Sequence, residues 1–212
     1  MKIKVVILDF DGVIVESVGI KDRAFRELFK DYPAYLKKIM EYHLSHNAIV
    51  RFEKFRYIME KIIGIEYNKK IEKELSMKFS ELVFNAIVDC SYVRGAKDFL
   101  NYFYGKVPIY LASISPADEL DRIVKARRLK KFFKKIYAVP WVKTDVIKDI
   151  MIKEDVKNKE VIFIGDSFED YQSAQKMKIS FIGRDSNKSF NRVRIPIYKD
   201  LFEIKEALMN KV

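Results

Sequence analysis

The hydrophobic and polar positions of the chain follow two different periods. An apolar, mostly β-branched stretch over 3–9, with the unbroken run Val5-Val6-Ile7-Leu8, predicts a buried strand. From about residue 16 to residue 90 no strand pattern occurs, and apolar residues recur at helical spacing. This part of the chain therefore predicts successive amphipathic helices, near 19–30, 33–45, 51–63 and 67–89. Pro33 suits the start of a helix, and Gly64 suits the end of one.

A second pattern begins near residue 91, where short apolar runs alternate with helical ones. The alternation predicts strands over 107–112, 136–139, 160–165 and 179–182, and an extended stretch near 193–197. The helices between and after them are expected over 116–129, 144–154, 168–177 and 200–210. Such alternation is typical of a parallel sheet with helices on both faces. The expected fold class is α/β, a doubly wound, Rossmann-like parallel sheet core with an inserted all-helical domain. We expect the core at 1–15 and 91–212 and the helical insertion at 16–90.

Length and composition agree with a folded protein that works in a reducing compartment. The chain has 212 residues and is 49% hydrophobic, which is ample material for a core. No apolar stretch reaches the roughly 20 residues of a membrane span, and the N-terminus lacks the pattern of a signal peptide. Cys90, the one cysteine, cannot form an internal disulfide. We therefore expect a cytoplasmic protein without a membrane partner.

The formal net charge of +11 favours anionic partners, either nucleic acid or small metabolites drawn toward a cleft. Positive residues are densest over 125–135, where apolar residues are interleaved with them. A solvated helix face explains this cluster better than an RNA-binding patch, because no nucleic-acid-binding motif accompanies it.

Asp9-Phe10-Asp11-Gly12 follows the first predicted strand directly. Side chains two apart on a strand point to the same face, so Asp9 and Asp11 can share one site while Phe10 packs the other way. Gly12 allows a sharp turn behind them. An ordinary Asp-Gly turn would have the same sequence, but two neighbouring carboxylates are tolerable only if a cation, a lysine or a shared proton balances them.

Further polar residues fall at or near the carboxyl ends of later predicted strands, where parallel sheets place their sites. Ser113 follows one strand, and Ser115 and Pro116 are expected at the N-cap and first position of the next helix. Asp166 stands at the tip of another strand, and Asp170 follows it. Clustered carboxylates favour a hard cation bound through oxygen, and we expect Mg²⁺; the chain has too few histidines and cysteines for a zinc site. Ser167 and Asp170 also suit a capping box, which would serve structure alone.

Taken together, these residues resemble the phosphatase branch of the haloacid dehalogenase superfamily. The first motif is Asp9-Phe10-Asp11-Gly12-Val13, the second is Ser113, the third is Lys143, and the fourth is Gly165-Asp166-Ser167-x-x-Asp170. They occur in the family's order, and the helical stretch between the first and second motifs resembles a C1-type cap. The third motif departs from the family, which commonly has Lys-Pro where this chain has Lys143-Thr144. Lys148 is a poor alternative, because it falls inside the predicted helix.

The resemblance implies a role for each motif. Asp9 would attack phosphorus and become an aspartyl phosphate, and Asp11 would act as the general acid and base. Ser113, the amide of Ile114 and Lys143 would hold the phosphoryl oxygens. Mg²⁺ would be the cofactor, and its ligands would be the Asp9 carboxylate, the Asp11 backbone carbonyl and Asp166, with Asp170 in the outer shell.

Substrate choice is expected to lie in the helical insertion. The candidates between its second and third helices are polar: His46, Asn47, Arg51 and Lys54. Related phosphatases often have a glycine-containing loop with a Ser-Arg pair here, and this chain lacks those glycines. Arg51 could bind an anionic group of the substrate or could simply be a surface arginine on an amphipathic helix.

The expected function is Mg²⁺-dependent hydrolysis of a small phosphorylated metabolite of the sugar phosphate or phosphoglycolate type. A phosphomutase of the β-phosphoglucomutase type has the same core and cap class and remains an alternative. A phosphonatase would need a cap lysine that forms a Schiff base. A non-catalytic nucleic-acid-binding protein on the same fold is the alternative that the net charge suggests. The sequence does not predict the oligomeric state.

Overall fold

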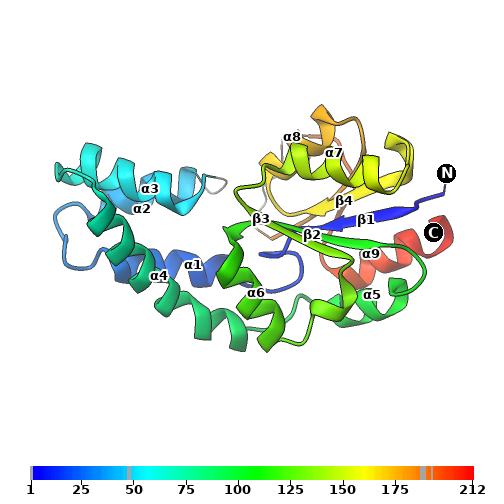
Figure 1. The fold of residues 1–212 in the computed structure, drawn as a ribbon, viewed down its shortest axis with the longest axis horizontal. Coiled ribbons are helices and arrows are strands. Elements are labelled where there is room, and N and C mark those ends of the chain that lie inside the picture. Colours follow the sequence, from blue (N-terminus) through cyan, green and yellow to red (C-terminus); the bar gives the residue numbers. More distant parts are fainter. Residues whose placement is uncertain (1, 47–48, 187–189, 192) are drawn as a thin grey trace. The chain divides into compact units, whose positions relative to one another are not determined.

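The computed structural model describes residues 2–46, 49–186, 190–191 and 193–212 (Figure 1). They form two compact units. The first comprises Met1–Glu16 with Cys90–Val212, and the second comprises Ser17–Asp89. The expected boundaries, at 15/16 and 90/91, differ from these by one residue at each crossing. The assignment of the two units as a catalytic core and a cap stays a prediction.

The first unit is built on a six-stranded sheet in the order β3-β2-β1-β4-β5-β6. Every pair of neighbouring strands is parallel. The strands are β1 (Val5–Leu8), β2 (Ile109–Pro116), β3 (Lys135–Val139), β4 (Val161–Gly165), β5 (Ser180–Arg184) and β6 (Ile197–Tyr198). The predicted parallel sheet is confirmed, and its order reverses direction at β1, so a crevice is expected outside the carboxyl ends of β1 and its neighbours.

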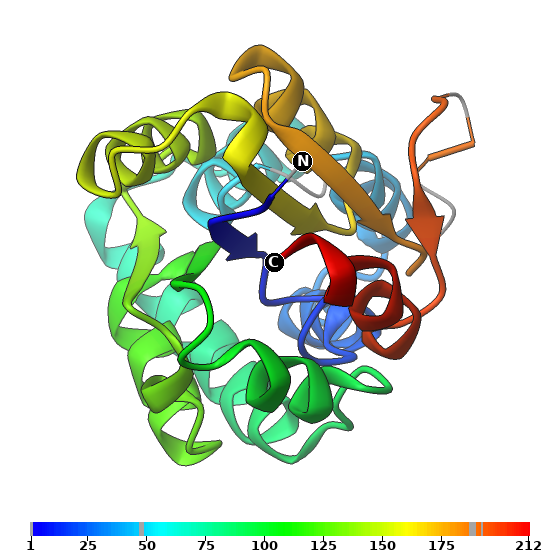
Figure 2. The ribbon, with the colours of Figure 1, turned by 90° about the vertical axis from the view of Figure 1, so that its right-hand side faces the viewer.

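Helices cover both faces of this sheet, as a doubly wound fold requires (Figures 1 and 2). On one face lie α7 (Lys143–Lys153) and α8 (Phe168–Lys176). On the other lie α5 (Ala96–Phe103), α6 (Ala117–Ala126) and α9 (Leu201–Leu208). Short 3₁₀ turns occupy Lys130–Phe132, Asn158–Glu160 and Met209–Lys211. The predicted α/β class is therefore confirmed.

The sequence pattern missed one helix, α5. Its buried residues do recur at helical spacing: Ala96, Phe99, Leu100 and Phe103. Because α5 has only eight residues and ends close to β2, its signal is short and adjoins that of the strand.

The four residues of β1 are completely buried, which explains their unbroken apolar run. A central parallel strand has helices on both faces and cannot alternate apolar with polar residues. On one face, Val5 and Ile7 join the cluster that contains Phe163 of β4 and Ile150 of α7. Burial on both sides holds the end of β1, and thus the residues that follow it, in a rigid frame.

The two segments that leave the first unit pair with each other before they cross to the second. Val15 and Tyr92 form an antiparallel bridge. The amide of Glu16 donates to the carbonyl of Ser91 at 3.0 Å, and the amide of Val93 donates to the carbonyl of Ile14 at 3.0 Å. The backbone on both sides of the crossing is therefore held within the first unit.

The second unit is helical throughout its regular structure. It consists of α1 (Val18–Leu28), α2 (Leu36–Ser45), α3 (Arg51–Tyr57), a π-helical turn (Ile58–Ile63) and α4 (Lys69–Asp89). The predicted helix over 51–63 is thus α3 continued by the π turn, and it ends at Gly64 in the left-handed conformation (φ 85°) as expected. Pro33 precedes α2 by three residues instead of starting it. Four aromatic rings form the centre of this unit: Phe25, Phe29, Phe55 and Phe79.

Candidate active site

Asp9 stands directly behind β1, beside the end of β4. Its amide donates to the carbonyl of Ile164 at 3.0 Å, which extends the β1–β4 ladder by one residue. Phe10 is buried with 1% of its surface exposed, and the chain then turns at Gly12, whose φ is 71°. The amide of Ile14 closes the turn by donating to the carbonyl of Phe10 at 2.9 Å. Asp9 is buried, whereas Asp11 stays half-buried within the turn.

Asp166 and Asp170 come from the end of β4 and the start of α8. Ser167 and Asp170 form the expected capping box, in which the Ser167 Oγ accepts from the amide of Asp170 at 3.1 Å. Gly165 is required here, because a Cβ at that position would lie 2.5 Å from the Cβ of Asp170. The glycine thus makes room for the Asp170 carboxylate, which is fully buried.

The three carboxylates of Asp9, Asp166 and Asp170 lie together, with one oxygen from each within 4.8 Å of the others. Burial raises the pKa of Asp9 well above its ordinary range; the Lys143 charge opposes this rise, and the charges of Asp170 and Asp166 add to it. Burial, followed by the charge of Asp170, raises the pKa of Asp166 to about 7. Burial is thus the main cause of both shifts, and the neighbouring carboxylates add to it.

Lys143, the first residue of α7, reaches this cluster with its ammonium group. Its Nζ donates to Asp9 Oδ1 at 2.9 Å and also to Asp170 Oδ1. Burial opposes the charge, but the carboxylates of Asp170 and Asp9 raise the pKa of Lys143 far above its ordinary value. Lys148, the poor alternative, is exposed on α7. Lys143 is therefore a permanent cation between two of the acids.

Ser113 lies within β2, which continues to Pro116 and is four residues longer than expected at this end. Its hydroxyl oxygen accepts from the amide of Ser115 at 3.2 Å, and its side chain is buried. Ile114 is half-buried. The expected N-cap at Ser115 is wrong: Pro116 occupies that position with extended backbone (ψ 144°), because β2 resumes pairing with β3 at Pro116 and Val139. Helix α6 then begins at Ala117.

The expected substrate residues of the helical insertion contact groups of their own unit. The Arg51 guanidinium donates to Ser80 Oγ at 3.2 Å and lies 5.1 Å from the Phe79 ring centre. The Lys54 Nζ lies 3.3 Å from both His43 Nδ1 and the His43 carbonyl oxygen. His46 Nδ1 lies 2.9 Å from the Tyr42 carbonyl oxygen. Asn47 lies outside the described residues. All of these contacts lie within the second unit.

Two residues at the carboxyl end of β5 were not anticipated. The Ser186 hydroxyl donates to Asp166 Oδ2 at 2.7 Å. Arg184, the last residue of β5, contacts the turn behind Asp9. Their position at the carboxyl end of a predicted strand could have indicated them, since β5 ends beside β4 at the same edge of the sheet.

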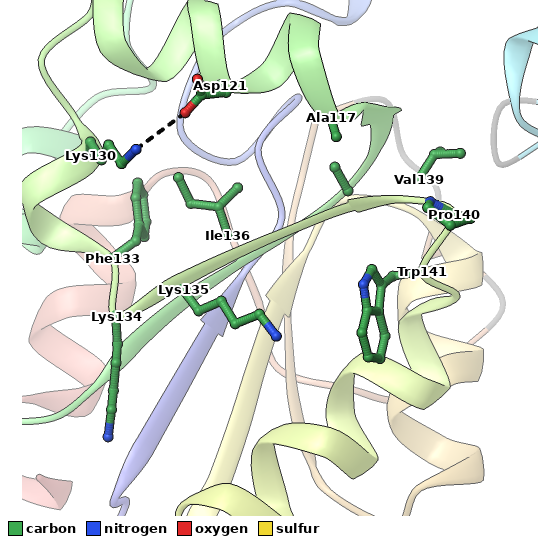
Figure 3. A pocket seen from close by; sticks show the side chains of 11 residues that line it. Ala117, Asp121, Lys130, Phe133, Lys134, Lys135, Ile136, Val139, Pro140 and Trp141 are labelled. Carbon is green, nitrogen blue, oxygen red and sulfur yellow. Dashed lines mark hydrogen bonds and ion pairs between the residues drawn. The ribbon is translucent and has the colours of Figure 1, made fainter.

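A separate groove of about 450 Å³ lies along the edge strand β3, and Figure 3 shows its lining. Asp121 of α6 and Trp141 behind β3 are among its residues, and none of the clustered acids lines it. Lysines of the basic cluster at this groove are ion-paired: Lys130 with Asp121 at 3.4 Å, Lys134 with Glu154 at 2.6 Å and Lys135 with Asp149 at 3.5 Å. The pairs reduce the charge that this surface would present to nucleic acid.

The chemistry of the donor set fits a divalent cation. The clustered ligand atoms are all carboxylate oxygens, which hard cations such as Mg²⁺ prefer. The raised pKa values of Asp9 and Asp166 point the same way, because a bound cation would stabilise both groups in their ionised form. The site thus has the composition that a small divalent ion requires.

Comparison with known proteins agrees with this geometry. Residues 6–184 match the haloacid dehalogenase-like hydrolase family, and the chain belongs to this family of enzymes. No curated protein matches the sequence significantly. Within the described residues, no helix has the length and apolar character to span a membrane.

Several solved structures have the same fold at low sequence identity. A predicted phosphoglycolate phosphatase from Haemophilus somnus has a TM-score of 0.75 and 16% identity, over 98% of each chain. YfnB from Bacillus subtilis, a proposed HAD-hydrolase bound to magnesium, has a TM-score of 0.71 and 16% identity, over 98% of this chain and 99% of the other. A proposed β-phosphoglucomutase from Thermotoga maritima has a TM-score of 0.73 and 17% identity, over 99% of this chain and 100% of the other.

Proposed function

We propose that the protein is a Mg²⁺-dependent phosphatase that hydrolyses a small phosphorylated metabolite through an aspartyl-phosphate intermediate. The observation that carries the proposal is the buried cluster of Asp9, Asp166 and Asp170 bridged by the Lys143 ammonium. Such a set of charges suits the transfer of a phosphoryl group, whose transition state depends on positioning and on charge neutralisation.

In the proposed first half-reaction, an Asp9 oxygen forms a bond to phosphorus while the bond to the ester oxygen breaks. Asp11 donates a proton to the departing oxygen. In the second half-reaction, Asp11 takes a proton from a water molecule that attacks the phosphorus of the aspartyl phosphate, which releases orthophosphate and restores Asp9. Asp11 can serve both steps because it lies in the half-buried turn behind Asp9.

Lys143 would hold the Asp9 carboxylate ionised and oriented, as its bond of 2.9 Å to Asp9 already suggests. The Ser113 hydroxyl accepts from the amide of Ser115, so its own proton is directed to another acceptor. We assign that proton, the amide of Ile114 and the Lys143 ammonium to the phosphoryl oxygens.

Mg²⁺, when bound, would neutralise the phosphoryl group so that an anionic carboxylate can approach it. Its proposed ligands are the Asp9 and Asp166 carboxylates and the Asp11 backbone carbonyl, and Asp170 would lie in the outer shell. The likeness to a predicted phosphoglycolate phosphatase supports a small substrate of the phosphoglycolate or sugar phosphate type. Arg51, Lys54 and His46 remain the proposed substrate contacts of the helical unit.

The test is orthophosphate release from a panel of phosphate monoesters, with Mg²⁺ and with EDTA. We expect metal-dependent release, and we expect Asp9→Asn to lower kcat by about 10⁴-fold or more without a change of fold. Asp98→Asn, an exposed residue of α5, is the matched control and should keep full activity. Full activity of Asp9→Asn would refute the nucleophile, and a requirement for a bisphosphate activator without net phosphate release would identify a phosphomutase instead.

A further inference from the structure

Arg184 makes a set of contacts that the proposed chemistry does not use. Its Nη1 donates to the Gly12 carbonyl at 3.0 Å and to Glu16 Oε2 at 3.0 Å. Its Nη2 donates to Glu16 Oε1 at 2.5 Å, and its Nε donates to the Lys199 carbonyl at 3.1 Å. Arginine has five N–H donors in a fixed planar fork, and four contacts of this kind fix the guanidinium in one orientation.

Three of these four hydrogen bonds go to the two ends of one short loop, Gly12 and Glu16. Gly12 follows Asp11 directly and has a left-handed φ of 71°, and Glu16 is the last residue of the first unit's N-terminal segment. Between them, the amide of Gly12 donates to the carbonyl of Val15 at 2.8 Å. Arg184, which lies outside this loop, therefore bridges its two ends, and the loop follows Asp11 directly.

The burial of Arg184 shows that the contact is not an ordinary surface ion pair. The arginine side chain is 10% exposed, whereas the Glu16 side chain is 45% exposed. An ion pair whose partners were both as exposed as Glu16 would contribute little to stability. A buried guanidinium on a backbone carbonyl, in contrast, fixes the position of the peptide to which it is bonded.

We infer that Arg184 is a positioning residue for Asp11, and that it acts by holding the carbonyl of Gly12 and the carboxylate of Glu16 in one frame. The inference rests on the proposed function, in which Asp11 carries the proton. Because β5 lies next to β4, the same rigid sheet edge then supports Asp166 and, through Arg184, the loop of Asp11. The guanidinium also ties this loop to the first crossing between the units, since Glu16 precedes the second unit directly.

Lysine at position 184 would keep the positive charge but would lack the planar set of N–H donors of the guanidinium. A single ammonium cannot reach the Gly12 carbonyl, both Glu16 oxygens and the Lys199 carbonyl together. We therefore expect Arg184→Lys to lower kcat by about 10- to 100-fold, because a misplaced general acid slows the chemical step, and to leave KM within about twofold. Glu16→Gln keeps an acceptor for the fork and should lower kcat by less than Arg184→Lys does.

Arg94→Lys is the matched control. Arg94 pairs with Asp200 at 3.2 Å in the same unit, and among the described residues its side chain has no hydrogen bond or ion pair with segment 9–16. Its replacement should leave kcat unchanged. A second readout, amide hydrogen exchange of segment 9–16 in the metal-free protein, needs no activity. Exchange should be faster than in the wild type for Arg184→Lys and unchanged for Arg94→Lys.

The two measurements separate the possible failures. If the wild type hydrolyses aryl phosphate with Mg²⁺ and Arg184→Lys has the same kcat at a temperature well below its Tm, the positioning role is wrong while the proposed function stands. If the wild type hydrolyses no phosphate monoester, the proposed function fails. In that case unchanged exchange in segment 9–16 would also reject the contact of Arg184 as the support of the loop, and faster exchange would retain it.

Discussion

Replacement of Asp166 by asparagine should make the metal-free protein more stable at neutral pH. Asp166 is 7% exposed, and burial together with the charge of Asp170 raises its pKa to about 7 from an ordinary value of 3.8. The side chain accepts one hydrogen bond, from Ser186 Oγ at 2.7 Å. An asparagine oxygen can accept the same bond, so the substitution removes the charge and keeps the shape.

The size of the effect follows from the two pKa values. A tenfold change in proton affinity corresponds to about 1.4 kcal/mol, so the difference between about 7 and 3.8 corresponds to about 4 kcal/mol. Below pH 3.8 the carboxyl is protonated in the folded and the unfolded protein, and Asp166 does not lower the free energy of unfolding of the wild type. Above about pH 7 the carboxyl is ionised in both states, and it lowers the free energy of unfolding by the full amount of about 4 kcal/mol. Stability of the wild type relative to Asp166→Asn therefore falls as pH rises between these values.

Urea unfolding followed by circular dichroism in EDTA measures this difference. Between about pH 5 and pH 8, the free energy of unfolding of the wild type should fall by about 2–3 kcal/mol relative to Asp166→Asn. Added Mg²⁺ at about 100 times its Kd should reduce the difference at neutral pH, since it stabilises the folded wild type by about 2.7 kcal/mol and Asp166→Asn should lose that gain. A difference between the two proteins that is the same at every pH would refute the argument.

Two further predictions concern stability alone. Lys143→Met should destabilise the metal-free protein by about 3–5 kcal/mol, because it leaves the buried carboxylates of Asp9 and Asp170 without their cation. Urea unfolding in EDTA measures this change, and an unchanged midpoint would contradict it. Gly95→Ala should cost about 3 kcal/mol or more, since φ is 78° and a Cβ would lie 2.3 Å from the Phe202 amide nitrogen. Gly105→Ala is its matched control, with φ 77° and nothing within 4 Å of the Cβ, and should cost about 1 kcal/mol. If the two alanine variants had equal urea midpoints, the close approach of the Phe202 backbone would not be the reason that position 95 is a glycine.

The acid cluster was accessible to sequence reasoning because two of its three members, Asp9 and Asp166, stand at the end of an apolar run. Asp9 follows four buried residues of β1, and Asp166 follows β4. Parallel strands bring such positions to one edge, whatever loops connect them. Arg184 ends strand β5 and Ser186 follows it, but nothing in their own segment indicates a partner. Their contacts depend on β5 lying beside β4, which is a property of the sheet and not of the segment.

Local periodicity determined the class of the protein: a parallel α/β sheet interrupted by helices, with carboxylates behind its strands. It could do so because burial on both faces of a strand, or on one face of a helix, is recorded in the spacing of apolar residues. Only the tertiary structure decided the strand order, the length of β2 past Ser113 and the partners of Lys143. These features depend on contacts between residues far apart in the chain, such as Lys143 and Asp9, and the hydrophobic pattern is the same for any order in which the strands pair.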